Sequence, residues 1–185
     1  QGVHYAADGS VVVTDRHKLL RIGGAHNFTE PFTSHAVTGA PIDGRYPDTS
    51  KIIPMELPTQ ITLVTGHNRD DLKDAIARVK LAVDVAKVAG DKSFITTLRK
   101  DGESASISVE GAVTFSAGLS ADTYGEDRAV SLNAELLLAA LNVFKDAGST
   151  RVIIGLTGAM SPIVLRDEEN EIDAIVLPYR RAGGV

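Results

Sequence analysis

The 185-residue chain contains no cysteine, which excludes a disulfide framework, a thiolate metal site and a cysteine nucleophile. This absence also suits a reducing compartment, so we expect a cytoplasmic protein. No apolar run approaches the roughly 20 residues that a membrane-spanning helix needs, and no basic, apolar leader opens the chain. The sequence begins at Gln1 rather than Met, and we expect part of the natural N-terminus to lie outside it.

Basic residues are outnumbered: 19 Lys and Arg stand against 24 Asp and Glu, for a net charge of -5. This balance argues against a protein coated with basic charge for wrapping nucleic acid, although a local basic surface remains compatible with it. Stacking platforms of the kind that bind single strands are not evident, because aromatic residues make up only 5% of the chain.

Hydrophobic periodicity, caps and turns predict the same order of elements twice. The first unit is a strand at 61–65, a turn with Asn68 as helix N-cap, a helix at 69–88 ending at Gly90, and strands at 93–99, 105–109 and 112–117. The second is a strand at 129–132, the N-cap Asn133, a helix at 134–147 ending at Gly148, and strands at 151–156, 162–166 and 173–177. We therefore predict an α+β fold of repeated β-α-β-β-β half-domains, with both helices on one face of antiparallel sheet.

The first 54 residues follow a different pattern. A hairpin around Asp8-Gly9 and a strand at 18–22 are predicted, and no helix is indicated before the segment Gly44-Arg45-Tyr46-Pro47-Asp48. We assign 1–54 to a partial or reduced domain and 55–185 to a complete one.

Motifs that carry catalysis are absent. The chain has no GxSxG, HExxH or P-loop, and no GxGxxG after a strand. Its five histidines match no metal-ligand spacing, and the acidic run 167–171 lacks the ligand alternation of a calcium loop. Ser10, Ser34 and Ser161 have no identifiable His and Asp partners, so a small α+β hydrolase is a weak alternative. We expect no enzyme activity, no cofactor and no metal.

Four cations share one edge of the first predicted helix: Arg69, Lys73, Lys80 and Lys87 fall within an arc of roughly 40°. Such an edge suits either a solvated helix face or loose, sequence-independent contact with DNA phosphates.

Several motifs resemble those of bacterial sliding clamps, the beta subunits of DNA polymerase III, in the order of that family. Thr14-Asp15-Arg16-His17-Lys18-Leu19 is similar to its Thr-Asp-Gly-His-Arg-Leu, and 44–48 with Ile52-Ile53-Pro54 is similar to its Gly-Arg-Phe-Pro-Asp segment. Further similarity lies in 132–141, in 157–165 and in the ending Ile175-Val176-Leu177-Pro178-Tyr179-Arg180.

This resemblance implies a DNA-clamp fold and a processivity factor of DNA replication. Clamps close as homo-oligomeric rings around double-stranded DNA, so the cationic helix edge is expected to face the DNA. They also tether the polymerase and the clamp loader through linear peptides, in the cytoplasm at the nucleoid during replication.

The peptide-binding pocket of the family, transferred residue by residue, comes from three blocks of this chain. They are Thr14, Arg16, His17, Lys18 and Leu19; Pro47, Lys51 and Ile52; and Pro162, Ile175, Leu177, Pro178, Tyr179 and Arg180. Leu19, Ile52, Pro162, Ile175 and Leu177 are expected to form an apolar cup with a polar rim.

The chain also departs from the family pattern. Arg16 replaces a Gly, and only 24 residues separate Leu19 from Gly44, too few for a complete middle domain. The sequence therefore suggests a fragment or a shortened phage or plasmid clamp. The alternative function is an adaptor that binds clamp-interacting peptides without encircling DNA.

Overall fold

The computed structural model describes residues 2–44, 46–49 and 51–179. The described residues form two antiparallel sheets and two helices, α1 (Asp71–Val88) and α2 (Ala134–Asp146). The larger sheet contains β1 (Gly2–Tyr5), β2 (Val11–Thr14), β3 (Lys18–Ile22), β4 (Phe32–His35), β5 (Thr59–Gly66), β6 (Arg69–Asp70), β10 (Asp122–Tyr124), β12 (Arg151–Leu156), β13 (Ile163–Asp167) and β14 (Ile172–Val176). The smaller sheet contains β7 (Ile95–Asp101), β8 (Ser104–Val109), β9 (Phe115–Leu119) and β11 (Arg128–Asn133).

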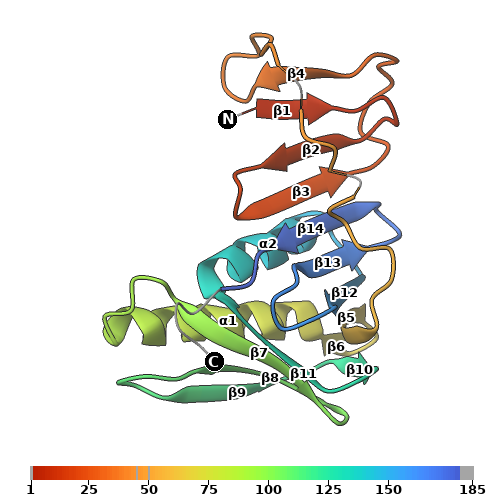
Figure 1. Ribbon diagram of the computed structural model, residues 1–185. Coiled ribbons are helices and arrows are strands. Elements are labelled where there is room, and N and C mark those ends of the chain that lie inside the picture. The colour runs from red at the N-terminus through yellow and green to blue at the C-terminus, as the bar shows by residue number, and fades with distance from the viewer. Residues whose placement is uncertain (1, 45, 50, 180–185) are drawn as a thin grey trace.

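The larger sheet joins the two ends of the chain. Its order is β10-β5-β12-β13-β14-β3-β2-β1-β4, with β6 paired to β5, and Figure 1 shows it rising from the helices to β4. The smaller sheet has the order β11-β7-β8-β9 and lies on the other side of α1 in the same view. The N-terminal strands therefore continue the sheet formed by β5, β12, β13 and β14.

The two β-α-β-β-β units have the same topology, as their sequence pattern predicted. Each unit gives its first strand to the sheet of the other: β5 pairs with β12, and β11 pairs with β7. α1 packs on α2, on β8 and on β9, whereas α2 packs on β13 and β14. Side chains from both units consequently share one hydrophobic core.

The predicted helix stripes face this core. Leu72, Val79 and Val83 of α1 are buried, as are Leu137, Leu141 and Phe144 of α2. Asn133 is the N-cap of α2, where its side chain accepts hydrogen bonds from the backbone N–H groups of Glu135 and Leu136. Gly90 and Gly148, with φ of 75° and 72°, follow the ends of the helices in the left-handed conformation that glycine adopts most easily.

The start of α1 differs from the sequence prediction. Asn68 is not the N-cap: His67 and Asn68, with φ of 48° and 72°, form a two-residue turn that pairs β6 with β5. The chain therefore runs back along β5 for Arg69 and Asp70 before the helix begins, and the N-cap is Asp70. Strands β4, β6 and β10 were not predicted, and β7 and β9 each lie two to three residues further along than expected.

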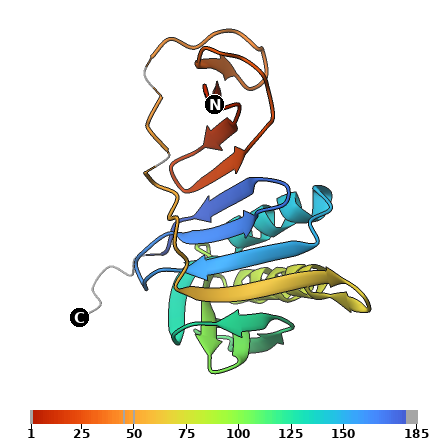
Figure 2. The same ribbon diagram turned by 90° about the vertical axis from the view of Figure 1, so that its right-hand side faces the viewer.

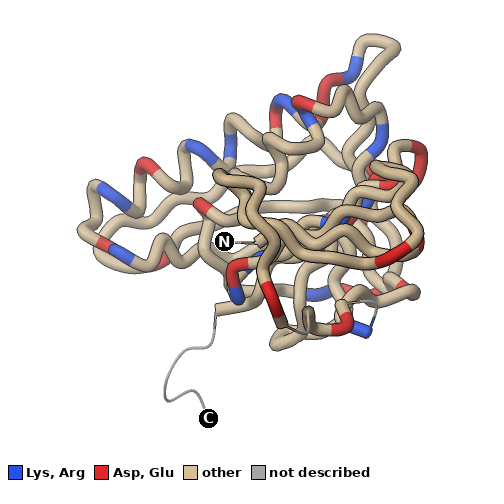
Figure 3. The backbone as a smooth tube through the Cα atoms, turned by 90° about the horizontal axis from the view of Figure 1, so that it is seen from above, with Lys and Arg blue, Asp and Glu red and all other residues tan. Residues whose placement is uncertain are grey.

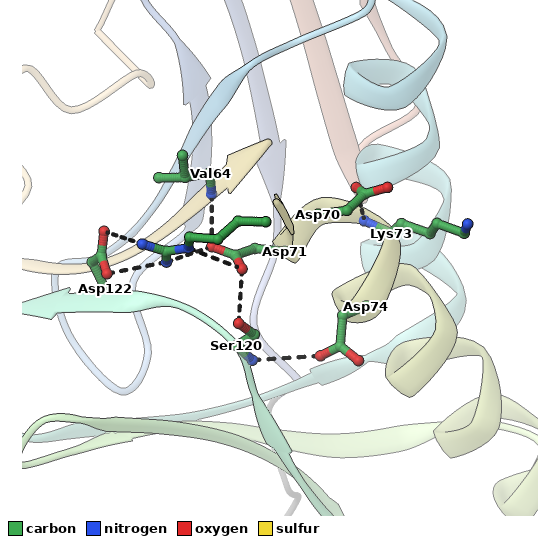
Figure 4. A network of polar contacts seen from close by, with 8 residues as sticks. Val64, Asp70, Asp71, Lys73, Asp74, Ser120 and Asp122 are labelled. Atoms are coloured by element: carbon green, nitrogen blue, oxygen red, sulfur yellow. Dashed lines mark hydrogen bonds and ion pairs between the residues drawn. The ribbon is translucent and has the colours of Figure 1, made fainter. Parts of the chain in front are cut away.

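A buried carboxylate fixes this junction (Figure 4). Asp71 lies 2.6 Å from the Arg69 guanidinium and accepts hydrogen bonds from the backbone N–H of Val64 and the hydroxyl of Ser120. Arg69 also pairs with Asp122 of β10 at 3.1 Å. Burial by itself raises the pKa of Asp71, but the hydrogen bonds from Arg69, Val64 and Ser120 together lower it below its usual value.

A strap formed by residues 46–49 and 51–58 crosses the face of the larger sheet that points away from the helices. Figure 2 shows it running from the N-terminal strands down to β5. Ile53 is buried with Val12, Leu19 and Ile175, and Tyr46 packs on the same cluster. Further along, Leu57 packs on Ile153 and Val164 and lies where a Cβ at Gly155 would clash, at 2.4 Å.

Arg166 of β13 holds the middle of the strap. Its guanidinium donates to the carbonyl oxygen of Pro54 at 3.0 Å and pairs with Asp173 at 2.6 Å. Of the two neighbouring isoleucines of the strap, Ile53 is buried against the sheet, whereas Ile52 is 42% exposed. Ile52, which the resemblance places in an apolar cup, thus has an exposed side chain, and the strap turns the neighbouring Ile53 inward instead.

We expect Asp71→Asn to lower the free energy of unfolding by about 2 kcal/mol at pH 7, because a charged, buried hydrogen-bond acceptor is lost. A carboxyl whose pKa is depressed in the fold stabilises it above the unfolded pKa of about 4 and loses that effect as the pH falls. The difference between wild type and variant should consequently shrink towards pH 3. Urea unfolding at both pH values measures this, with the exposed Asp84→Asn as control; an equal loss in the control would contradict the role of Asp71.

Truncation of the two neighbouring isoleucines should separate their roles. Ile53→Ala is expected to cost about 2 to 4 kcal/mol because it opens a cavity under the strap. Ile52→Ala should stay within about 1 kcal/mol, as is usual for an exposed position. Equal losses in urea unfolding would show that the strap does not pack as described.

Candidate peptide and DNA contact surfaces

A tight turn at 15–18 connects β2 and β3. One carboxylate oxygen of Asp15 accepts hydrogen bonds from the backbone N–H groups of His17 and Lys18, and the other lies 2.6 Å from the Lys18 ammonium. Thr14 donates its hydroxyl to the carbonyl oxygen of Lys18. Burial raises the pKa of Asp15, but these hydrogen bonds from Lys18 and His17 together hold it below its usual value. The turn is thus rigidly held.

The C-terminal segment after β14 connects this turn to the smaller sheet. The backbone N–H of Leu177 donates to the carbonyl oxygen of His17 at 3.0 Å, and that of Tyr179 donates to Ser131 at 2.7 Å. Pro178 forms a bridge with Leu132 at the end of β11. Residues from opposite ends of the chain therefore meet here.

An open hollow of about 640 Å³, which we call the C-terminal hollow, lies at this meeting point. Its lining combines apolar side chains with imidazole, amide and hydroxyl groups and contains no carboxylate. The lining residues are His17, Ser93, Asn133, Leu136, Met160, Pro162, Leu177, Pro178 and Tyr179. Leu177 is 39% exposed, so its side chain is accessible from the solvent.

The structure thus brings together one part of the predicted pocket, namely His17, Pro162, Leu177, Pro178 and Tyr179. Ser93, Asn133, Leu136 and Met160 were not predicted as lining residues. Asn133 and Leu136 lie in a block of family similarity, but their caps and periodicity explained them as helix-forming residues. Ser93 and Met160 carried no signal in the sequence.

Another part of the predicted pocket lies on the helix side of the sheet. Thr14, Lys18, Leu19 and Ile175 border an apolar hollow of about 440 Å³ between the N-terminal strands and α2. Leu19 and Ile175 are directly paired residues of β3 and β14. Their side chains belong to the buried cluster under the strap, on the face of the sheet away from the helices. They therefore border the hollow without forming an open surface in it.

The remaining predicted pocket residues are dispersed. Pro47 borders a third hollow of about 420 Å³ beneath the strap, and Lys51 pairs with Asp48 at 3.6 Å on the surface. Arg16 is exposed at the tip of the turn at 15–18. Arg180 lies outside the described residues.

The predicted cationic edge is divided by the structure. Lys73 and Lys80 are exposed on α1, and neither ammonium has a partner among the described residues. Lys87 on the same edge lies 3.7 Å from Glu135 of α2. Arg69 does not belong to the helix edge, because β6 directs it to Asp71 and Asp122. Figure 3 shows acidic positions interspersed among the basic ones along the helices, and in Figure 4 the Lys73 side chain points away from the Asp71 network.

Among the described residues, no group of three or more His, Cys, Asp or Glu is placed to hold a metal ion. No helix in the described part of the chain is long and apolar enough to cross a membrane.

Comparison with known proteins identifies relatives, although no family model matches the sequence. The beta sliding clamp of Bacillus subtilis (strain 168) is 30% identical over 143 residues, which are 75% of this chain and 35% of that protein.

Solved sliding clamps have the same fold. The crystal structure of the Bacillus subtilis clamp matches 98% of this chain and 57% of its own with a TM-score of 0.74 at 20% identity. A Pseudomonas aeruginosa clamp bound to griselimycin matches 97% of this chain and 57% of its own with a TM-score of 0.77 at 13% identity. The chain therefore spans about a third of the curated relative and little more than half of the solved clamps. It is a relative of the bacterial beta sliding clamps, the beta subunits of DNA polymerase III, and it has their fold.

Proposed function

We propose that the chain acts as a DNA sliding clamp, a non-enzymatic processivity factor that tethers the replicative polymerase to duplex DNA. The observation that carries this proposal is the C-terminal hollow, where His17 meets Pro162, Leu177, Pro178 and Tyr179. These residues come from motifs at the two ends of the chain, and a shared contact surface gives a reason for their proximity.

A short linear peptide suits the chemistry of the C-terminal hollow. Leu136, Met160, Pro162 and Leu177 offer apolar contacts, and each large hydrophobic anchor buried there contributes roughly 1.5 to 3 kcal/mol. Imidazole, amide and hydroxyl groups of His17, Asn133 and Ser93 orient the peptide backbone. A few anchors then supply most of the affinity, as is usual at protein interfaces. The polymerase and the clamp loader are the proposed sources of such peptides.

DNA contact is proposed for the exposed edge of α1. The ammonium groups of Lys73 and Lys80 have no partner in the part of the chain that the structure describes, and such groups attract phosphates without reading base sequence. Such contacts release counterions and exchange readily, and they are therefore compatible with sliding. Arg69 and Lys87 already have carboxylate partners and contribute less.

Ring closure around DNA requires further copies or further domains. We propose that 55–185 is a complete C-terminal clamp domain, because it contains both β-α-β-β-β units. Residues 1–54 are then part of a middle domain: the strands β1 to β4 extend the sheet, and no helix occurs among the described residues before Asp71. Copies of the chain would associate into a homo-oligomeric ring.

An adaptor that binds clamp-interacting peptides without encircling DNA is the second candidate. The N-terminal strands favour it, because β1 to β4 extend the sheet and no helix accompanies them among the described residues before Asp71. Mass measurement in solution separates the two functions: a ring requires a defined oligomer, whereas a monomer at all concentrations would favour the adaptor.

Leu177→Asp should weaken binding of a fluorescent peptide from the clamp-binding tail of a replicative polymerase by at least tenfold, because it places a charge in the C-terminal hollow. Leu81→Asp is the matched control, since Leu81 is similarly exposed, at 47%, but lies on α1. Both variants should remain folded by circular dichroism. Equal affinities for wild type and Leu177→Asp in an anisotropy titration would mean that the peptide site is elsewhere.

The double variant Lys73→Ala/Lys80→Ala should weaken binding to a short DNA duplex and reduce the slope of log K against log salt by about 1.8 if both ammonium groups contact phosphates. Arg99→Ala/Arg151→Ala removes the same charge from exposed positions on the sheet faces opposite the helices. This control should leave the slope nearly unchanged. An unaltered slope in the lysine variant would exclude the helix edge as the DNA contact.

A further inference from the structure

Two thioethers are the only sulfur groups of the sequence, which has two methionines and no cysteine. Met55 lies on the strap and is 88% exposed, and Met160 is 53% exposed. Both side chains are thus open to a dissolved oxidant, and no thiol of the sequence competes with them for it.

Met160 lies in the tight turn between β12 and β13. The backbone N–H of Ser161 closes this turn by donating to the carbonyl oxygen of Gly158 at 3.1 Å. The side chain of Met160 lines the C-terminal hollow, where Leu136 and Leu177 also offer apolar contacts. Its thioether is therefore among the few large apolar groups that the hollow presents to a ligand.

Met55 borders a different hollow. It belongs to the lining of the 420 Å³ hollow beneath the strap, and its carbonyl oxygen accepts a hydrogen bond from Arg166 at 3.4 Å. Met55 is not among the residues that line the C-terminal hollow. The chain thus places one thioether in the candidate peptide site and a more exposed one outside it.

We propose that Met160 is a redox-modification site, whose oxidation to the sulfoxide by hydrogen peroxide weakens peptide binding in the C-terminal hollow. The inference rests on the proposed peptide site and adds a form of regulation to it. The thioether sulfur attacks one oxygen atom of the peroxide, and a sulfur–oxygen bond forms as the O–O bond breaks. The departing hydroxide takes the proton of the transferred oxygen and leaves as water. The sulfur is thereby oxidised by two electrons, and the peroxide is reduced.

The sulfoxide changes what the hollow offers to a peptide. A thioether is apolar and flexible, so it adapts to hydrophobic anchors of different shape. The sulfoxide oxygen is a polar acceptor, and it loses its hydration when an apolar anchor covers it. A dithiol-dependent sulfoxide reductase reverses the change, since its two thiols become a disulfide and the oxygen leaves as water. Peptide affinity then follows the balance between peroxide and reductase.

Variants that each retain one thioether test this proposal. Met55→Leu and Met160→Leu are treated with hydrogen peroxide, and mass spectrometry confirms the gain of one oxygen atom. A fluorescent peptide from the clamp-binding tail of a replicative polymerase, chosen to lack Met and Cys, is titrated before and after treatment. Oxidised Met55→Leu should bind the peptide at least fivefold more weakly than its untreated sample, and sulfoxide reductase should restore the affinity. Met160→Leu is the matched control, and oxidation should leave its affinity where it was.

Oxidation of wild type with saturating peptide present gives an independent readout. The peptide should slow the oxidation of Met160 at least threefold and leave that of Met55 unchanged, because it covers the C-terminal hollow alone. Unchanged affinity of oxidised Met55→Leu, an equal loss in oxidised Met160→Leu, or no protection by the peptide would overturn the role of Met160. A loss of the circular dichroism signal on oxidation would do the same, since unfolding would then explain the weaker binding. Failure of untreated wild type to bind the peptide would instead overturn the proposed peptide site, and this inference with it.

Discussion

The pairing of β14 determines how the rest of the molecule is arranged. This strand pairs with β13 on one side and with β3 on the other, so it joins the N-terminal strands to the sheet of the second unit. Its continuation then leaves the larger sheet and hydrogen-bonds to β11 through Tyr179 and Ser131. A single chain segment consequently connects both sheets and the N-terminal turn. The C-terminal hollow exists because these three parts converge on Leu177, Pro178 and Tyr179.

Exchange of strands between the two units makes this arrangement cooperative. β5 precedes α1 in sequence but pairs with β12 of the second unit, and β11 precedes α2 but pairs with β7 of the first. Neither unit can bury its own hydrophobic face alone, because the missing edge of each sheet is supplied by the other. Asp71 stabilises the point where β5 passes into α1, with contacts to Val64, Arg69 and Ser120. The shared core is thus fixed at a junction that belongs to both sheets.

The sequence predicted those features whose causes are local. Asn133 as a cap, Gly90 and Gly148 as helix ends and the apolar stripes of both helices depend on neighbours a few residues away, and the structure confirms them. The start of α1 was wrong because Asn68 fits a helix cap and a two-residue hairpin turn equally well, and only pairing with β5 decides between them. Ile52 and Ile53 are equally apolar, so the inward residue is determined by the path of the strap. Met160 and Ser93 reach the C-terminal hollow only through tertiary packing.

Cations in this protein fall into two groups according to their partners. Arg69, Lys100 and Arg166 pair with carboxylates and also hold nearby chain segments: Lys100 donates to the carbonyl oxygen of Gly125 and pairs with Asp127, and Arg166 holds the strap. Removing their charges would expose unpaired acids, so these residues serve the fold.

Lys73, Lys80 and Arg16 are exposed and without partners among the described residues. A ligand that binds an exposed, unpaired cation does not have to break an ion pair within the protein. The attraction between the cation and an incoming phosphate or carboxylate is then reduced only by solvent screening. Among the described residues, nine other cations pair with a carboxylate, whereas the exposed Lys92, Arg99, Lys145 and Arg151 also have no partner. Pairing within the protein, rather than the count of basic residues, therefore indicates which surfaces are open to an anionic ligand.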